Sequence, residues 1–451
     1  MYELLSGPEA SALDKSLISK YSLSEEHLIK NAASFVFSNH KELFKDKTIL
    51  FIVGKGNNGS DALYLASLSL SCAKKVYIYM HFPLSSGENE RFKERLDKSL
   101  FVQDLVDADV IVDGLFGVKM RPECEERTQR VVNFVNSSNA YVISLDVPSL
   151  YKIKANCTTS FMALKREMYL PQNRAMCGSI ELYNPGFPSH DIKGNGKYFL
   201  LTFSDYKSRK FNLADYKNTR GDLTIVGGCS KYLGAPILSS LAAFHTGCGK
   251  VRVLSTEKVN DAIVSSYPSI ILAQSLKESS SFVVGPGWGR GSKKKLEEIA
   301  LSGKNIVIDA DALKLLPSLN LKLGYRAIIT PHLGEAKMLL KELNINSEDY
   351  YEAIKELCKR LEVIVVSKSS TVTISDGDNV YIVDGANPSL GVAGSGDALS
   401  GIIGAFLAQG MGPLSSALNG TLLHQESGKR AHEKWGFYSA ENLIEMVGKT
   451  R

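Results

Sequence analysis

Short runs of apolar, β-branched residues alternate with amphipathic helical segments along most of this 451-residue chain. In its first part, apolar residues recur at helical spacing over 8–20 and 25–39. Predicted strands follow at Thr48–Val53, Lys75–Met80, Val110–Asp113, Tyr141–Asp146, Thr159–Leu164 and Ser179–Tyr183. Near-continuous apolar runs of this kind are typical of parallel strands covered by helices on both faces. The pattern predicts one α/β domain over residues 1–205.

A second series of the same kind begins after the polar, aperiodic segment 205–221. Its predicted strands are Leu223–Val226, Lys250–Leu254, Ser281–Val284, Ile306–Ile308, Ala327–Thr330 and Val363–Ser367. A hairpin over Thr371–Ser375 and Val380–Val383, joined by Asp-Gly-Asp, follows them. The sequence therefore predicts a second α/β domain over 206–451, and no internal repeat is found.

The bulk composition is that of an ordinary soluble protein, with 44% hydrophobic and 22% charged residues. The net charge of +5 is small and is not gathered into a basic block. It permits an anionic ligand but does not indicate nucleic acid. The N-terminus lacks the apolar run of a signal peptide, and the longest apolar stretch, within 398–408, is too short to cross a bilayer. The seven cysteines form no CxxC pair and have no histidine cluster near them in the sequence. This argues against a disulfide framework and against zinc, and it predicts reduced thiols and a cytoplasmic protein.

The stretch from Asn387 to Gly410 carries the most distinctive chemistry. A loop of small residues, with glycines at 391, 394 and 396, opens into a predicted helix. Unpaired backbone N–H groups and the positive end of the helix dipole form an anion site at such a turn. Asp397 lies at the helix start, where it could accept a proton from a hydroxyl while the amides hold a phosphoryl group. The alternative is a tight helix start capped by Ser395 or Asp397.

Other loops at predicted strand ends add to this site. They are GGCSKYLGAP (227–236), GPGWGR (285–290), DADAL (309–313), TPHLGEA (330–336) and SKSSTV (367–372). Each could be a plain turn between a strand and a helix. Because the carboxyl ends of parallel strands face one crevice, together they are expected to bring glycines, two carboxylates, His332 and Lys368 to Asp397.

The first predicted domain has a glycine loop of its own. GKGNNGSD, residues 54–61, follows a strand and matches G-x-G-x-x-G. A dinucleotide fold would end the next strand in an acidic residue, but it ends Met80-His81-Phe82, and Asp61 in the first helical turn would repel a pyrophosphate. A hydride-transferring enzyme is therefore disfavoured. Asn57, Asn58 and Asp61 instead suggest ligands for a cation or for the amide and hydroxyl groups of a substrate.

Two further predicted strand ends carry carboxylates, Asp113 in VDGLFG and Asp146 in SLDVPS. With Asn58 they are expected to converge at one edge of the sheet, where they could hold a hard cation or perform acid–base chemistry. The alternative is that each aspartate only caps the turn or helix that follows it.

These motifs match a known family. GNNGSD, VDGLFG and SLDVPS resemble the N-terminal epimerase domain of the bifunctional NAD(P)H-hydrate repair enzymes, and GGCSKYLGAP, GPGWGR, DADAL, ITPHLGEA and GSGDALSGIIGAFLAQG resemble their C-terminal dehydratase domain. The ordered set spans nearly the whole chain. The resemblance implies a Rossmann-like three-layer sandwich followed by a ribokinase-like domain. The first would interconvert the epimers of hydrated NADH or NADPH, and the second would remove the water at the expense of ADP or ATP.

The resemblance also implies roles for individual residues, with Asp397 and Asp146 as the catalytic groups. In the first domain the hydrate would contact Asn57, Asn58, Gly59, Ser60, Asp61, Gly117 and Asp146. In the second it would contact Ala235, Gly287, His332 and Asp397. The nucleotide would contact Lys368, Ser369, Ser370, Thr371, Val372 and Gly396, with Mg²⁺ bridging its phosphates. A K⁺ ion would be held by Asn58, Asp113 and Ser149.

The chain departs from the family pattern mainly in its first domain, which reads GNNGSDA for GNNGGDG and has Leu150 where DVPSG ends in glycine. A side chain there adds a Cβ and removes freedom at positive φ. The alternative function is a ribokinase-type kinase for a small alcohol, such as a vitamin precursor, with a non-catalytic N-terminal binding module. We expect a small-molecule substrate, no nucleic acid or membrane partner, and a homo-oligomer.

Overall fold

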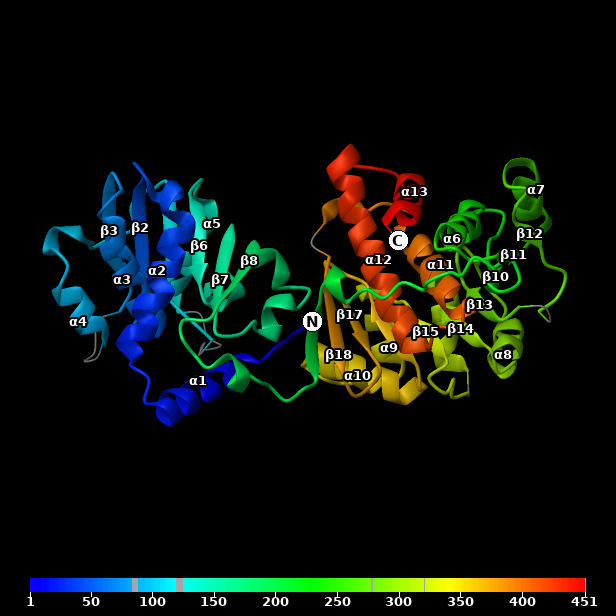
Figure 1. Ribbon diagram of the computed structural model, residues 1–451, viewed down its shortest axis with the longest axis horizontal. Helices are drawn as coiled ribbons and strands as arrows, with labels where there is room; N and C mark the ends of the chain where they lie inside the picture. The colour runs from blue at the N-terminus through cyan, green and yellow to red at the C-terminus, as the bar shows by residue number, and fades with distance from the viewer. Residues whose placement is uncertain (83–87, 119–124, 277–278, 320, 386, 451) are drawn as a thin grey trace. The chain divides into compact units, whose positions relative to one another are not determined.

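The computed structural model describes residues 1–82, 88–118, 125–276, 279–319, 321–385 and 387–450. The chain forms two compact units, Tyr2–Tyr198 and Phe199–Arg451, the second also including Met1 (Figure 1). The division falls before the predicted boundary at 205/206. The reason is that β9 (Tyr198–Leu201), a strand the apolar pattern did not reveal, adjoins β18 (Val380–Asp384) in the sheet of the second unit.

The N-terminal unit contains a seven-stranded sheet of order β4-β3-β2-β5-β6-β7-β8, in which every neighbouring pair is parallel. The strands are β2 (Thr48–Val53), β3 (Lys75–Met80), β4 (Phe101–Val102), β5 (Val110–Gly114), β6 (Tyr141–Leu145), β7 (Cys157–Phe161) and β8 (Ser179–Tyr183). Strand β7 begins and ends earlier than predicted, and the two-residue β4 is too short to give an apolar run. The strand order reverses between β2 and β5, which makes their carboxyl ends the expected ligand site.

Helices cover both faces of this sheet, which gives the predicted three layers. They are α2 (Glu25–Phe44), α3 (Asn57–Ser69), α4 (Glu88–Glu94) and α5 (Glu126–Ser137), whereas α1 (Gly7–Tyr21) packs in a separate cluster with Met162 and Phe187. Alternate residues of β2 point to opposite sides, so Phe51 packs with Val36 of α2, whereas Leu50 packs with Val131 of α5. The α1 helix begins where Ser6 and Glu9 form a reciprocal capping box.

The sheet of the C-terminal unit has the order β9-β18-β17-β16-β15-β14-β13-β10-β11-β12. Its remaining strands are β10 (Asp222–Val226), β11 (Lys250–Leu254), β12 (Ile271–Leu272), β13 (Ser281–Val284), β14 (Asn305–Ile308), β15 (Ala327–Ile329), β16 (Ile364–Ser367), β17 (Thr371–Ser375) and β18 (Val380–Asp384). Strands β10 to β16 pair in parallel, and β16, β17 and β18 pair antiparallel, which confirms the predicted hairpin. The order reverses between β10 and β13.

The helices of this unit are α6 (Gly234–His245), α7 (Glu257–Ser266), α8 (Lys293–Leu301), α9 (Leu333–Glu342), α10 (Tyr350–Leu361), α11 (Ser395–Ala408), α12 (Pro413–Trp435) and α13 (Ala440–Thr450). The predicted apolar helix is α11, almost entirely buried. Its glycines allow close packing, because a Cβ on Gly401 would lie 2.2 Å from the Ser239 carbonyl oxygen of α6. Among the described residues, no helix is both long and apolar enough to cross a membrane.

Candidate active sites

The start of α11 is an open turn. Its N-cap is Gly394, whose φ of 91° is left-handed, and no side chain caps the helix. The alternative of a cap by Ser395 or Asp397 is therefore wrong, since the Ser395 hydroxyl instead pairs with His424 at 3.1 Å. Within the described part of the chain, no hydrogen bond reaches the backbone amides of Gly396 and Asp397 or the Asp397 carboxylate. The amides and this carboxylate remain available to a ligand.

Burial is the main influence on the Asp397 carboxyl group. The pKa of Asp397 is raised from 3.8 to about 7, first by burial and then by the negative charge of Asp309, against the lowering effect of the positive charge of Lys368. Asp309, at the end of β14, is buried and pairs with Lys368, with 2.9 Å between Oδ1 and Nζ. A carboxyl group with a pKa near neutrality can take up and release a proton during turnover.

Lys368 follows β16 and lies over the first turn of α11, because a Cβ on Gly396 would be 3.3 Å from its ammonium nitrogen. Its backbone N–H donates to the Pro331 carbonyl at 2.8 Å, which holds His332 next to it. His332 caps α9 and accepts hydrogen bonds at Nδ1 from Gly334 and Glu335. Its side chain is 62% exposed. Asp397, Gly396, Lys368 and His332 thus lie along one edge of the sheet.

The two loops at the strand reversal pack tightly together. Gly287 has a φ of 60°, and a Cβ there would lie 3.0 Å from the Cβ of Ala235. The Gly289 amide donates to Asp311 at 2.8 Å, which ties the GPGWGR loop to the DADAL loop. On the other side, the Ser239 hydroxyl of α6 donates to the Asp397 carbonyl at 2.8 Å. Ala235 and Gly287 therefore adjoin the same helix pair that positions Asp397.

The predicted nucleotide segment connects β16 to β17. Ser370 is exposed and Ser369 is half-buried, with its hydroxyl bonded to the main chain of Thr371. The side chains of Thr371 and Val372, in contrast, are buried in the sheet. Their exposure is 0% and 2% for the whole residue, main chain included, so the accessible part of the predicted segment is Lys368 to Ser370.

In the N-terminal unit, a cavity of about 520 Å³ lies at the strand reversal of the sheet. Its walls include five of the predicted residues, Asn57, Asn58, Asp61, Gly117 and Asp146, and also Lys165. The side chains converge, because a Cβ on Gly117 would lie 3.5 Å from both the Asn58 Cγ and the Asp146 Oδ2. Gly59 and Ser60 differ, since they lie in the buried part of α3 and do not reach the wall.

Two carboxyl groups face each other in this cavity. Asp61 lies in the second turn of α3 rather than in the first, and burial followed by the negative charges of Asp146 and Asp14 raises its pKa well above the usual range. Asp146, at a φ of 66°, forms an ion pair with Lys165, whose side chain is 3% exposed. Sequence reasoning missed Lys165. The available signal was its position directly after a predicted strand, as for the other site residues.

Asp113 is the centre of a buried hydrogen-bond network. Its carboxylate accepts from the Ser144 hydroxyl at 2.9 Å, from the Ser149 amide at 2.9 Å and hydroxyl at 2.6 Å, and from the Leu115 amide at 3.3 Å. The loop-capping alternative therefore describes part of its role. Asn58 lies close by and donates through Nδ2 to the carbonyls of Phe116 and Leu145, which leaves its Oδ1 without a hydrogen bond among the described residues.

Leu150, which replaces a glycine of the family pattern, has a φ of 57°. A left-handed backbone at a leucine costs roughly 1–2 kcal/mol. Leu150 also lines the cavity. The loop therefore keeps the backbone conformation that favours glycine while it adds an apolar side chain to the wall.

Comparison with solved structures identifies the fold of one part of the chain. A ribokinase-like superfamily protein from Enterococcus faecalis matches with a TM-score of 0.51 and 20% identity, over 56% of this chain and 94% of that chain. An ADP/ATP-dependent NAD(P)H-hydrate dehydratase from Bacillus subtilis, co-crystallised with ATP and Mg²⁺, matches with a TM-score of 0.50 and 21% identity, over 57% and 98%. The chain thus contains a ribokinase-like α/β domain.

The family follows from the sequence models. The model described as NAD(P)H-hydrate dehydratase matches residues 223–449, and the model described as YjeF-related protein N-terminus matches residues 25–167. The chain belongs to the NAD(P)H-hydrate dehydratase family, and it has the two-domain organisation of the bifunctional NAD(P)H-hydrate repair enzymes. The relative from Dictyoglomus turgidum is 27% identical over 94% of this chain and 92% of its own length, and that from Escherichia coli is 28% identical over 83% and 79%.

Proposed function

We propose that the C-terminal unit dehydrates the S epimer of hydrated NADH and NADPH at the expense of ADP or ATP, and that the N-terminal unit interconverts the R and S epimers. The observation that carries the first activity is the Asp397 carboxylate, which has no partner in the described chain and adjoins two unpaired amides at the start of α11. A base and a phosphoryl-binding turn on one helix are what transfer of a phosphoryl group to a hydroxyl requires.

In the proposed reaction, Asp397 removes the proton from the ring hydroxyl of the hydrate. The hydroxyl oxygen bonds to the terminal phosphorus of the nucleotide, whose bond to the bridging oxygen breaks, giving AMP from ADP. The amides of Gly396 and Asp397 and the Lys368 ammonium stabilise the charge on the transferring group. Phosphate then leaves with its bonding electrons while the ring nitrogen donates a pair, and loss of a ring proton restores the double bond.

The residues present are compatible with Mg²⁺ carried by the nucleotide phosphates. Asp309 already pairs with Lys368 and accepts from the Ala310 amide, so it is poorly placed to hold a cation alone. The phosphate oxygens themselves would supply the ligands, as is usual for a cation that retains several waters. Bound in this way, Mg²⁺ would neutralise part of the negative charge of the phosphates.

For epimerisation, Asp61 and Asp146 form a pair with different environments. Burial favours the protonated form of Asp61, whereas Asp146 pairs with the Lys165 ammonium. In such a pair, the protonated Asp61 can donate a proton to the hydrate hydroxyl, and Asp146 can accept one. Four oxygen-bearing groups lie together here and would hold K⁺, a cation that prefers oxygen ligands: the Asn58 amide, the Asp113 carboxylate, the Phe116 carbonyl and the Ser149 hydroxyl. The ion would supply positive charge beside the substrate.

The test is an absorbance assay at the nicotinamide band with separated hydrate epimers. We expect recovery of the reduced cofactor from the S epimer with ADP or ATP, and from the R epimer only while the N-terminal unit is active. Turnover of ATP with a small vitamin-precursor alcohol, and none with either hydrate, would favour the kinase alternative. The free cysteines at six described positions suit the reducing cytoplasm that this substrate implies, and the homo-oligomer stays a prediction.

A further inference from the structure

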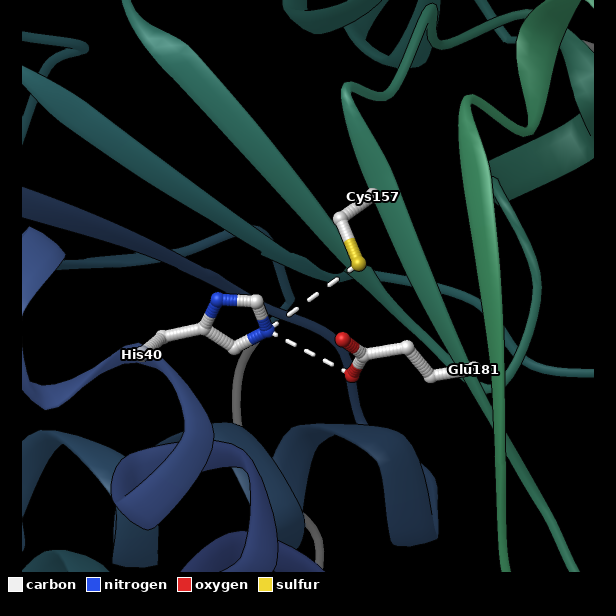
Figure 2. A group of neighbouring side chains, drawn as sticks. All are labelled: His40, Cys157 and Glu181. Atoms are coloured by element: carbon white, nitrogen blue, oxygen red, sulfur yellow. Dashed lines mark hydrogen bonds and ion pairs between the residues drawn. The ribbon is translucent and has the colours of Figure 1, made fainter.

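Three side chains that the proposed reactions do not use meet in the N-terminal unit (Figure 2). They are His40 near the end of α2, Cys157 at the start of β7 and Glu181 in β8. The His40 Nε2 lies 4.0 Å from the Cys157 sulfur and 3.5 Å from the Glu181 Oε2, and the three ligand atoms all lie within 4.8 Å of one another. We propose that His40, Cys157 and Glu181 bind a divalent transition-metal ion of the Zn²⁺ class.

The register of the sheet explains why two of the side chains meet. Cys157 is opposite Ser179, and Thr159 is opposite Glu181. Since side chains two positions apart share a face, Cys157 and Glu181 form a diagonal pair on neighbouring strands. Helix α2 covers this face, where Phe35 stacks on Tyr183 with 4.0 Å between ring centroids. That contact fixes the helix on β8 and brings His40 over the diagonal pair.

The observed separations suit tetrahedral coordination. Bonds of about 2.3 Å to sulfur and about 2.1 Å to nitrogen or oxygen place tetrahedral ligand atoms roughly 3.3–3.6 Å apart. The nitrogen–oxygen distance of 3.5 Å already fits, and the nitrogen–sulfur distance of 4.0 Å requires a movement of about half an ångström. One thiolate, one imidazole and one carboxylate favour zinc over magnesium or calcium, and water would complete the four ligands.

The surroundings support a bound ion. The Thr159 hydroxyl donates to the Glu181 Oε2 at 3.2 Å, and would orient that carboxylate as an outer-shell partner. Cys157 is buried, His40 is 11% exposed at its side chain and Glu181 is 32% exposed, so the ion would be largely shielded while the carboxylate side remains accessible.

The site is separate from the catalytic cavity. Phe161 and Met162, at the far end of β7 from Cys157, line that cavity, whereas His40, Cys157 and Glu181 do not. A bound ion would join α2, β7 and β8 and stabilise their packing, because it binds the folded unit but not the separated ligands. The inference therefore does not depend on the proposed catalytic function.

The experiment uses the full-length reduced protein, freed of metal with a chelator and titrated with Co²⁺. Cobalt bound by a thiolate in a tetrahedral site gives a near-ultraviolet charge-transfer band and visible bands, which Zn²⁺ should abolish by displacement. We expect one equivalent to give these bands in the wild type. Cys157→Ser should remove them, whereas Cys72→Ser, which changes a half-buried cysteine of the same unit, should retain them.

A second pair of variants lies on one helix. His40→Ala should abolish both the bands and the rise in melting temperature with Zn²⁺, whereas His27→Ala, exposed at the start of α2, should preserve both. Thr159→Val should raise the Kd for Zn²⁺ by about tenfold, because it removes an outer-shell hydrogen bond to a ligand. Absence of a thiolate–cobalt band in the folded wild type, or an unchanged band in Cys157→Ser, would overturn the proposal.

Discussion

The Lys368 ammonium lies 2.9 Å from the Asp309 carboxylate, and the two charges act on Asp397 with opposite signs. The pair joins the ends of β16 and β14, two strands that flank β15 in the sheet. Asp309 favours the protonated form of Asp397, and Lys368 favours the ionised form. Burial is the main cause of the raised pKa of Asp397, and this ion pair from two other strand ends adjusts it in both directions.

Substitution of the proposed base should separate catalysis from binding. Asp397→Asn is expected to lower kcat for dehydration by about 10²–10⁴-fold, which is the usual contribution of a general base. The Kd for ADP or ATP should change little, because backbone amides form the phosphate site. Single-turnover kinetics and calorimetric titration of the nucleotide measure the two quantities. Asp261→Asn, which changes an exposed aspartate of α7 in the same unit, is the matched control, and equal turnover by Asp397→Asn would remove Asp397 from this role.

The value of kcat/KM should increase as pH rises through about 7, because Asp397 loses its proton there. Asp309→Asn removes the negative neighbour and leaves Lys368 unopposed, so the pKa of Asp397 should fall and the acid limb should move to lower pH. Lys368→Met removes the positive neighbour, so the limb should move to higher pH. Full pH profiles of the three proteins test this, and shifts in the same direction would contradict the assignment of the limb.

The same carboxyl group should affect stability. Its folded-state pKa of about 7 lies above its ordinary value of 3.8, so its favourable contribution is present below pH 3.8 and is lost as pH rises through 7. Asp397→Asn, which stays neutral, should therefore be more stable than the wild type at pH 8, by at most roughly 4 kcal/mol and by less where solvent reaches the half-buried carboxylate. The gain should shrink toward pH 4. Denaturant unfolding of the C-terminal unit at both pH values checks the trend, which a constant difference would contradict.

In the N-terminal unit, Asp146→Asn should abolish epimerisation and also leave Lys165 as an unpaired buried charge. The free energy of unfolding of that unit should fall by about 3–5 kcal/mol. The double variant Asp146→Asn with Lys165→Met removes both charges, so it should recover stability without activity. Proton nuclear magnetic resonance of the epimer ratio and chemical denaturation give the two readouts. A stable but inactive double variant would show that epimerisation is lost because a catalytic group is missing and not because the unit unfolds. Restored epimerisation would exclude Asp146 as a catalytic group.

Most strand bounds could be predicted, because near-continuous apolar runs such as Thr48–Val53 and Ser281–Val284 match observed strands residue for residue. The two-residue strands β4 and β12 escaped prediction, since their pairing depends on neighbours in the sheet and not on a local pattern. The glycine loop and Asp397, in contrast, could be predicted from the sequence alone. A helix start is local, so a few consecutive residues specify its open amides.

The sequence by itself determined two α/β domains, their glycine loops and the carboxylates at strand ends. Only the tertiary structure decided which of those groups meet, as with Lys368 and Asp309, Lys165 and Asp146, or His40 and Glu181. The physical reason is that apolar periodicity fixes where strands begin and end, whereas strand order and register fix which side chains face each other. Those are set by packing between segments far apart along the chain.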